Sequence, residues 1–224
     1  MPEHAVQTPG GSVPELPRPL TRRDRRRMQE GALVRILTVC TGNVCRSPVA
    51  ATVLAARLAD LPVVVHSAGT HAPVGQSITP QSGRIAARAG ADDDAIASHR
   101  ARYLVEPMIA EADLVLGMTA EHRDAAVHLM PRKQRHVLAV REFAALSATL
   151  TDDQIAATAQ AAGPIPAQRV AAAVAAVTRS RTLSEAQDVI DPYRQSDAVY
   201  QQMANELLPA IDEVARVIRA ALRG

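Results

Sequence analysis

The sequence predicts an α/β protein in which a four-stranded parallel sheet is flanked by helices. Short apolar runs of strand length alternate along the chain with longer runs of helical spacing, a pattern typical of right-handed βαβ crossovers. The short runs are apolar at consecutive positions, as strands buried on both faces are. A glycine-containing loop directly follows the first run, which is where open parallel sheets bind their ligands.

Each element is predicted from its own pattern. Runs of aliphatic and β-branched residues predict four strands, at 34–39, 63–66, 113–118 and 136–140. Helical spacing of apolar and alanine residues predicts four helices, at 49–59, 79–89, 120–128 and 195–223. Helices on both faces of the sheet give a three-layer, Rossmann-like sandwich.

A single domain is expected over 32–224, preceded by a tail. Residues 1–31 contain prolines, adjacent glycines and a cluster of arginines, and they lack the apolar core of a signal peptide. They are predicted to be a disordered, solvated tail. The formal net charge of the whole chain is only +2, so no nucleic-acid partner is expected.

The domain is expected to carry an alanine-rich helical insertion at about 144–187. Gly163, Pro164 and Pro166 are predicted to break it into two helices. The second helix has an apolar face formed by side chains at helical spacing: Val170, Val174 and Val177. This surface suits a lid over the ligand site, packing on the sheet edge or a subunit contact, but simple helical padding is the interpretation we favour.

The loop after the first strand is the most informative motif of the chain. It reads Cys40, Thr41, Gly42, Asn43, Val44, Cys45, Arg46, Ser47, Pro48, a Cys-x5-Arg phosphate loop. A loop of this kind points its backbone N–H groups inward and binds a tetrahedral oxyanion. Because the thiolate is the nucleophilic form, Cys40 needs the positive potential that these amides and Arg46 supply. Arg46 is expected to fork onto two phosphoryl oxygens while Cys40 attacks phosphorus.

The other loop residues are expected to shape the anion site. Those predicted to bind phosphate are Thr41, Gly42, Asn43, Val44, Cys45 and Ser47. Gly42 and Asn43 tolerate the positive φ that a tight loop requires. Ser47 is expected to be the N-cap of the following helix, with Pro48 at its first position, and to donate its hydroxyl to the Cys40 sulfur.

With these residues in place, the loop resembles the signature of the low-molecular-weight protein tyrosine phosphatases, whose fold is shared with thiol-dependent arsenate reductases. Four later segments resemble that family's segments in the same order, at 67–70 (Ser-Ala-Gly-Thr), 98–102 (Ser-His-Arg-Ala-Arg), 112–119 and 188–193 (Asp-Val-Ile-Asp-Pro-Tyr). The resemblance implies the strand order 2-1-3-4. It also implies a phosphatase activity.

The late Asp-Pro-Tyr segment gains its meaning from the resemblance. It implies that Asp191 is the general acid, which protonates the leaving oxygen and later activates water, on a loop stiffened by Pro192. Tyr193 is implied as the residue that stacks on a substrate ring, since the segment after Thr70 lacks a bulky side chain. Taken alone, the Asp-Pro dipeptide indicates a turn, and Asp188 a helix or turn cap.

The chain has two cysteines, Cys40 and Cys45, both in the phosphate loop. So few cysteines exclude a disulfide framework and indicate a reducing compartment, so a cytoplasmic location is expected. In the resembled family the second loop cysteine forms a reversible disulfide with the nucleophile and protects it from over-oxidation. Cys45 either takes that part or is a small packing residue at the base of the loop.

The implied reaction is the hydrolysis of phosphotyrosine on bacterial proteins, or of small aryl phosphates, through a phosphocysteine intermediate. Arsenate has the shape and charge of phosphate, so reduction of arsenate by a single protein cysteine and an external small thiol is an alternative. A relay through further protein cysteines is disfavoured because no cysteine follows Cys45. A non-catalytic module that binds oxyanions or a partner is the second alternative. Cys40, Arg46 and Asp191 together favour the phosphatase.

No metal or other cofactor is expected. The histidines His122, His128 and His136 lack the paired carboxylate or cysteine spacing of a metal site, and no dinucleotide fingerprint follows the first strand. No membrane span is visible in the sequence. The expected partner is the substrate, a phosphorylated protein or a small aryl phosphate. The protein itself is expected to be a monomer or a weak dimer. A structural role, tying a loop to the sheet or to Asp113, is expected for His99, Arg100 and Arg102.

Overall fold

The fold is taken from a computed structural model that describes residues 31–179 and 187–223. The predicted tail lies outside the described residues except for Gly31, and so does the part of the insertion at 180–186. None of the described helices is both long enough and apolar enough to cross a membrane.

The sheet confirms the predicted α/β class. Its four strands are β1 (Val34–Cys40), β2 (Val63–Gly69), β3 (Leu114–Gly117) and β4 (Val137–Ala139). All neighbouring strands pair in parallel, in the order β2-β1-β3-β4 that the family resemblance implied. The two central strands are buried along nearly their whole length, which explains their continuous apolar sequence.

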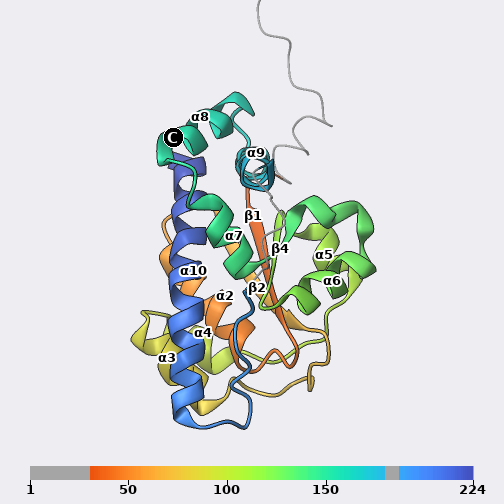
Figure 1. The fold of residues 1–224 in the computed structure, drawn as a ribbon, viewed down its shortest axis with the longest axis vertical. Coiled ribbons are helices and arrows are strands. Elements are labelled where there is room, and N and C mark those ends of the chain that lie inside the picture. Colours follow the sequence, from red (N-terminus) through yellow and green to blue (C-terminus); the bar gives the residue numbers. More distant parts are fainter. Residues whose placement is uncertain (1–30, 180–186, 224) are drawn as a thin grey trace, which may run out of the picture.

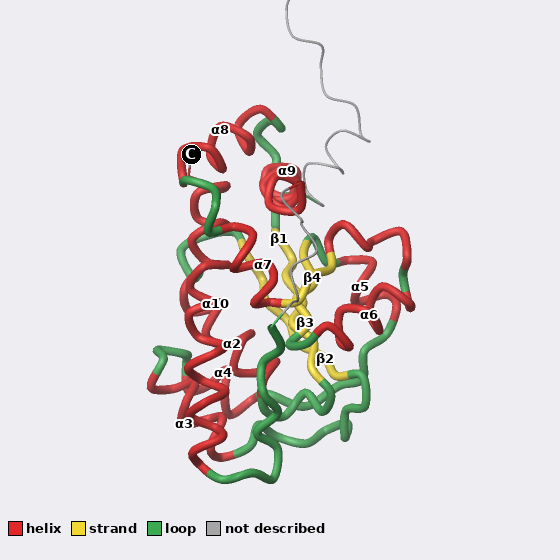
Figure 2. The backbone as a smooth tube through the Cα atoms, viewed as in Figure 1, coloured by secondary structure: helices red, strands yellow, loops and turns green. Residues whose placement is uncertain are grey.

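Helices cover both faces of the sheet, as Figures 1 and 2 show. Side chains alternate across β1: Ile36 faces a large core built with the long C-terminal helix, whereas Leu37 and Val39 face a smaller core on the other side. The helices are α2 (Arg46–Arg57), α3 (Pro80–Arg88), α4 (Asp93–Ser98), α5 (Glu106–Glu111), α6 (Ala120–Leu129), the 3-10 helix η1 (Pro131–His136), α7 (Val140–Ser147), α8 (Asp152–Ala161), α9 (Pro166–Arg179) and α10 (Asp197–Arg223). In Figure 1, α5 and α6 lie on one side of the sheet and α2, α3, α7 and α10 on the other.

The predicted strand at 136–140 is longer than the observed one. Only Val137–Ala139 pair as β4, because His136 ends η1 and Val140 begins α7. Here Glu142 accepts a hydrogen bond from the backbone N–H of Ala139 at 3.2 Å and so fixes the start of α7. The expected start of the insertion, at residue 144, therefore falls inside a helix that leads directly out of the sheet.

Residues 148–179 form two helices, α8 and α9, separated at Gly163, whose φ of 98° suits glycine. The apolar face of α9 is covered within the chain, because Val170, Val174 and Val177 are buried. The backbone N–H of Ala167 donates to the carbonyl of Gly31 at 3.2 Å, which puts the start of α9 at the amino end of β1. These two helices therefore do not form a lid over the phosphate loop (Figure 1).

Candidate active site

The phosphate loop, residues 40–46, joins the carboxyl end of β1 to the start of α2. Cys40 is buried, and its sulfur lies 3.2 Å from the backbone N of Asn43 and 3.0 Å from the hydroxyl oxygen of Ser47. Ser47 in turn accepts a hydrogen bond from Nδ2 of Asn43 at 3.0 Å, so its own proton is directed toward the sulfur or the carbonyl of Ala68. Both contacts favour negative charge on the sulfur.

Arg46 lies beside this sulfur and is anchored at its outer nitrogens. Nη1 donates to the carbonyl of Val189 at 3.2 Å, and Nη2 donates to the hydroxyl of Thr41 at 3.3 Å and to Oδ2 of Asp191 at 2.7 Å. The remaining donor, Nε, is buried and has no hydrogen-bond partner among the described residues. A buried donor without a partner is costly, so this atom marks a place where a bound oxyanion would be stabilised.

The segment that carries Asp191 is fastened to three separate elements. The N–H of Val189 donates to the carbonyl of Met118 at the end of β3, at 3.0 Å, and the N–H of Ile190 donates to Glu206 of α10, at 2.9 Å. Asp188 accepts a hydrogen bond from the backbone N of Ala120 at 2.8 Å. The cap expected for Asp188 is therefore present, but on α6 rather than on a neighbouring helix or turn.

The start of α2 corrects the capping prediction for Ser47. The helix begins at Arg46 after Cys45, and no side chain makes the cap hydrogen bond. Ser47 and Pro48 therefore lie inside the first turn of α2. Backbone N–H groups in the first turn have no intrahelical acceptor, so the missing N–H of Pro48 costs no helical hydrogen bond. The predicted contact between Ser47 and the sulfur is present, and it takes the hydroxyl that a cap would have used.

The backbone of the loop also differs from prediction at Gly42. Asn43 has a positive φ of 52°, but Gly42 is not among the described residues with positive φ. The glycine that the loop does require is Gly69, at the end of β2: a Cβ there would lie 2.4 Å from the carbonyl oxygen of Thr41 and 2.9 Å from the N of Asn43. The absence of a side chain at Gly69 thus lets the loop backbone pass against β2.

Asn43 is held in its uncommon conformation by the segment that follows α4. His99 donates from Nε2 to the carbonyl of Asn43 at 2.8 Å, and the N–H of Arg102 donates to its side-chain oxygen at 3.0 Å. Arg102 also donates from Nε to the carbonyl of Ser67, so the expected tie to the sheet is present. Asp113, the other partner expected for this group, accepts the backbone N–H of Arg35 at 2.8 Å.

A cavity of about 290 Å³ opens over the loop. It is lined by Cys40, Thr41, Gly42, Val44, Cys45, Arg46, His71, Pro73, Asp191 and Tyr193. Asn43 and Ser47 are fully buried behind this lining, so they support the loop rather than face the cavity. Tyr193 is partly exposed at the rim, its backbone N–H donates to Asp191 at 3.2 Å, and its ring lies under the guanidinium of Arg194, 5.2 Å from the ring centroid.

Both cysteines are free and buried. The thiol of Cys45 lies 3.5 Å from the hydroxyl of Thr79 and 3.7 Å from the hydroxyl of Tyr200. Burial raises the pKa of Cys45, which keeps this thiol protonated at neutral pH. Cys45 is therefore not a reactive thiolate at neutral pH.

Sequence reasoning missed one buried histidine at the site. His122 lies in the first turn of α6, and its Nε2 is 2.9 Å from the hydroxyl of Thr41. In residues 31–179 and 187–223 no cluster of three or more potential metal-binding side chains occurs. A Thr-x-x-His pattern at the start of a helix that follows a strand is the signal that places this ring near the loop.

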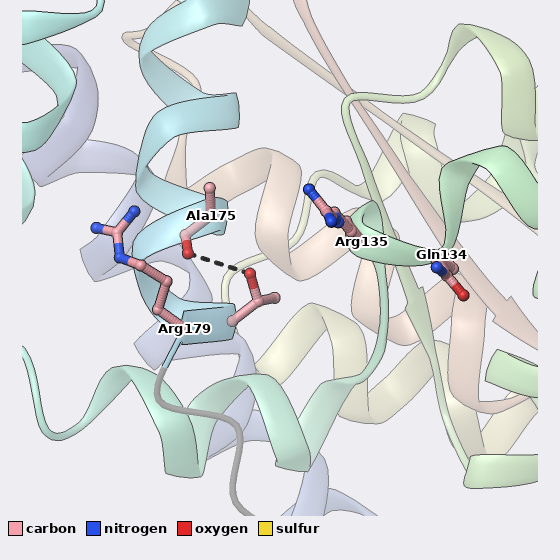
Figure 3. A pocket seen from close by; sticks show the side chains of 5 residues that line it. Gln134, Arg135, Ala175 and Arg179 are labelled. Carbon is pink, nitrogen blue, oxygen red and sulfur yellow. Dashed lines mark hydrogen bonds between the residues drawn. The ribbon is translucent and has the colours of Figure 1, made fainter.

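A second, larger cavity of about 640 Å³ lies between η1 and α9 (Figure 3). Its lining consists of Gln134, Arg135, Ala175, Thr178 and Arg179. Because η1 leads into β4, this cavity lies at the amino ends of the strands, whereas Cys40 lies at a carboxyl end. Cys40, Arg46 and Asp191 all line the smaller cavity.

Comparisons with known proteins agree with this geometry. A family model described as low molecular weight phosphotyrosine protein phosphatase matches residues 35–155. The chain is 36% identical over 110 residues to the protein-arginine-phosphatase of Geobacillus stearothermophilus, covering 49% of this chain and 70% of that protein. It is 35% identical over 108 residues to the probable low molecular weight protein-tyrosine-phosphatase EpsP of Ralstonia nicotianae, covering 48% and 71%. The solved low molecular weight protein tyrosine phosphatase from T. tengcongensis superposes with a TM-score of 0.57 at 28% identity, covering 81% of this chain and 97% of that one.

Proposed function

Because the chain belongs to the low molecular weight phosphotyrosine protein phosphatase family, we propose that it hydrolyses phosphotyrosine or aryl phosphate monoesters through a phosphocysteine on Cys40. The roles of the site residues follow from their positions. The loop amides and Arg46 hold the phosphoryl oxygens, Cys40 supplies the nucleophile, and Asp191 supplies and removes the proton.

In the first step the phosphoryl dianion enters the cavity and takes over the guanidinium of Arg46. Its oxygens satisfy the unpartnered Nε and replace the carboxylate of Asp191 at Nη2. The Cys40 sulfur then attacks phosphorus while the bond to the leaving oxygen breaks. Asp191, released from Arg46 and protonated from solvent, gives its proton to that oxygen, so the product is a neutral phenol.

In the second step water attacks the phosphocysteine. Asp191, now a carboxylate, accepts a proton from the water, the phosphorus–sulfur bond breaks, and inorganic phosphate leaves. The departing thiolate of Cys40 is stabilised by the N–H of Asn43 and the hydroxyl of Ser47, both already within 3.2 Å of the sulfur.

The observation that carries the proposal is the buried Nε of Arg46, which lacks a partner among the described residues beside a buried cysteine. The test is hydrolysis of an aryl phosphate by the wild-type chain and by Cys40→Ser. We expect turnover in the wild type, a phosphorylated enzyme trapped by rapid acid quenching, and neither in the variant. Phosphate binding without turnover or adduct would instead support a non-catalytic module, and arsenate-dependent consumption of an external thiol without ester turnover would support arsenate reduction.

A second candidate, hydrolysis of phosphoarginine, is favoured by the similarity to the Geobacillus protein-arginine-phosphatase. A guanidino leaving group carries several N–H donors and needs acceptors around it. Asp191 is the one carboxylate among the described residues that line the cavity. Val44, Pro73 and Tyr193 also belong to this lining. This apolar lining suits an aryl ring better. The ratio of kcat/KM for an aryl phosphate to that for phosphoarginine decides between them.

We also place the protein in the cytoplasm. Both cysteines are free, and the catalytic cycle needs Cys40 in its reduced form, which a reducing compartment maintains. Cell fractionation with alkylation of Cys40 before lysis tests this location. Recovery of the chain from an oxidising compartment would contradict it.

A further inference from the structure

His122 is buried, with 3% of its surface exposed, yet it touches the phosphate loop through a single hydrogen bond. Its Nε2 lies 2.9 Å from the hydroxyl of Thr41, and its Nδ1 lies 2.7 Å from the hydroxyl of Thr119. The ring therefore bridges the start of α6 and the residue that follows the nucleophile. No role in the two reaction steps described above requires it.

The bridge continues from Thr41 to the arginine of the loop. The hydroxyl of Thr41 accepts a hydrogen bond from Nη2 of Arg46 at 3.3 Å, and the same nitrogen reaches Asp191 at 2.7 Å. Arg46 can only donate, so the Thr41 oxygen must turn a lone pair toward it. Whatever orients the Thr41 hydroxyl therefore orients one acceptor of the guanidinium.

The fold fixes the histidine ring rigidly. Thr119 is the N-cap of α6, and its hydroxyl oxygen also accepts the backbone N–H of His122 at 3.3 Å. The first turn of α6 lies tightly against the end of β3, because a Cβ on Gly117 would be 2.7 Å from the N of Arg123 and 3.2 Å from the carbonyl carbon of His122. The ring thus has little freedom to leave Thr41.

We propose that His122 is a positioning residue that acts through Thr41: its Nε2 accepts a hydrogen bond from the Thr41 hydroxyl, so that the Thr41 oxygen presents its lone pair to Arg46 and holds the guanidinium ready for the phosphoryl group. The proposal rests on the proposed function of the same site. His122 touches neither the cavity nor the reacting atoms, since it is absent from the cavity lining.

The proton pattern of the bridge is consistent with this role. Burial, reinforced by the charge of Arg46, lowers the pKa of His122 to about 4, so the ring is neutral at physiological pH and one ring nitrogen can accept. With Nε2 as the acceptor, Nδ1 carries the proton and donates to Thr119. The Thr119 oxygen then accepts from Nδ1 and from the backbone N–H of His122, as an N-cap oxygen does.

The experiment is a double-variant cycle with His122→Leu, Thr41→Val and their combination. His122→Gln retains a terminal amide that reaches the place of Nε2 and serves as the conservative rescue. His128→Leu is the matched control, because it changes an exposed histidine of the same helix. The readouts are kcat/KM for an aryl phosphate and the Kd of inorganic phosphate measured by calorimetry, with thermal unfolding of each variant recorded beside them.

We expect His122→Leu and Thr41→Val each to lower kcat/KM by roughly tenfold to a hundredfold, since a small misplacement of a positioning group has effects of that size. Phosphate affinity should fall in parallel. In the Thr41→Val background, His122→Leu should have no further effect, because the bond it removes is already gone. His122→Gln should recover most of the loss, and His128→Leu should leave kcat/KM unchanged.

The proposal is overturned if His122→Leu keeps wild-type kcat/KM, or if the two effects multiply in the combined variant, as they would for an independent structural role. If His122→Leu does not fold, His122→Asn takes its place in the cycle, because its amide is too short to reach Thr41. Failure of the proposed function looks different: the wild type then turns over no aryl phosphate. The phosphate Kd still tests the positioning role in that case, since binding needs no turnover.

Discussion

The guanidinium of Arg46 and the carboxylate of Asp191 form an ion pair in the substrate-free protein, with Nη2 2.7 Å from Oδ2. The arginine side chain is 4% exposed and the aspartate side chain 50% exposed, so the pair joins a buried anion-binding group to a carboxylate at the rim. In the proposed mechanism a bound phosphoryl group competes with Asp191 for Arg46. Substrate entry then separates Asp191 from the arginine before Asp191 donates its proton.

This competition predicts different effects of Asp191→Asn on binding and on chemistry. The kcat for an aryl phosphate should fall by about 10²- to 10⁴-fold, the usual range for loss of a general acid. The Kd of inorganic phosphate should stay the same or decrease, because the variant removes a negative charge that competes for Arg46. Steady-state kinetics and competitive inhibition by phosphate measure both quantities.

Asp212→Asn is the matched control, because this aspartate pairs with Arg57 on the surface of α10. It should leave both quantities unchanged. A marked loss of phosphate affinity in Asp191→Asn would show that the carboxylate organises the anion site instead of competing for it.

Removal of the Ser47 hydroxyl should slow the chemistry of the sulfur. In Ser47→Ala the sulfur of Cys40 loses a donor 3.0 Å away, and Nδ2 of Asn43 loses its acceptor. We expect alkylation of Cys40 by iodoacetate at neutral pH to slow by roughly tenfold, since a hydrogen bond to a charged group contributes about 1.5–3 kcal/mol. Mass spectrometry of timed samples measures this rate.

The exposed Ser98 offers the comparison, and Ser98→Ala should be alkylated at the wild-type rate. Equal rates in Ser47→Ala and the wild type would mean that the hydroxyl contributes nothing to the reactivity of the sulfur.

Gly69→Ala should damage stability and activity together. The added Cβ would lie 2.4 Å from the carbonyl oxygen of Thr41, so the strand and the phosphate loop must move apart. We expect the free energy of unfolding to fall by about 1–3 kcal/mol, as overpacking does, and kcat/KM to fall as well because the loop shifts. Urea denaturation and aryl phosphate assays test the two effects.

Gly83→Ala is the paired substitution, in the middle of α3. There the nearest atom to a new Cβ is a methyl of Ile96 at 3.4 Å, an ordinary contact. The free energy of unfolding should rise by up to about 1 kcal/mol, from helix propensity alone. Destabilisation by both variants to the same extent would refute the steric argument for Gly69.

The pH dependence of stability should report the burial of His122. Its pKa is about 4 in the folded protein, against about 6.5 for a free histidine. The unfolded chain therefore binds a proton first as the pH falls, and the stability present above pH 6.5 is progressively lost down to about pH 4. The loss from this one group is on the order of 3 kcal/mol.

Comparison with His122→Gln isolates this contribution, because the other titrating groups are shared by the two proteins. The difference in the free energy of unfolding between wild type and variant should shrink by that amount from pH 7 to pH 4. Urea denaturation at each pH measures this difference. A difference that does not vary with pH would mean that the pKa of His122 is the same in the folded and the unfolded chain.

The sequence alone predicts the sheet well, because strands buried on both faces leave continuous apolar runs. It also predicts the approach of Cys40 and Arg46, since seven consecutive residues between a strand and a helix bring them together. The strand order and the position of Asp191 came from the family resemblance. Local pattern alone could not bring a residue 145 positions from Arg46 to its side.

The errors at Ser47 and Gly42 share one physical origin, the tertiary contacts of the loop. Ser47 has the sequence of an N-cap, but its hydroxyl is taken by the sulfur and by Asn43. Gly42 has the composition of a tight turn, but the steric demand falls on Gly69 of another strand. The short helices α4, α5 and η1 are 6 residues each and too brief to show a helical period.

The turn at Gly163 joins α8 to α9 near the amino end of β1, and a side chain at that glycine would meet no atom within 4 Å. Cys40 lies at the other end of the same strand, which is 7 residues and thus roughly 23 Å long. A fluorophore or an affinity peptide attached at this turn is therefore separated from the phosphate loop by the full length of β1. The molecule accordingly offers a handle for immobilisation or single-molecule observation on the side remote from its ligand.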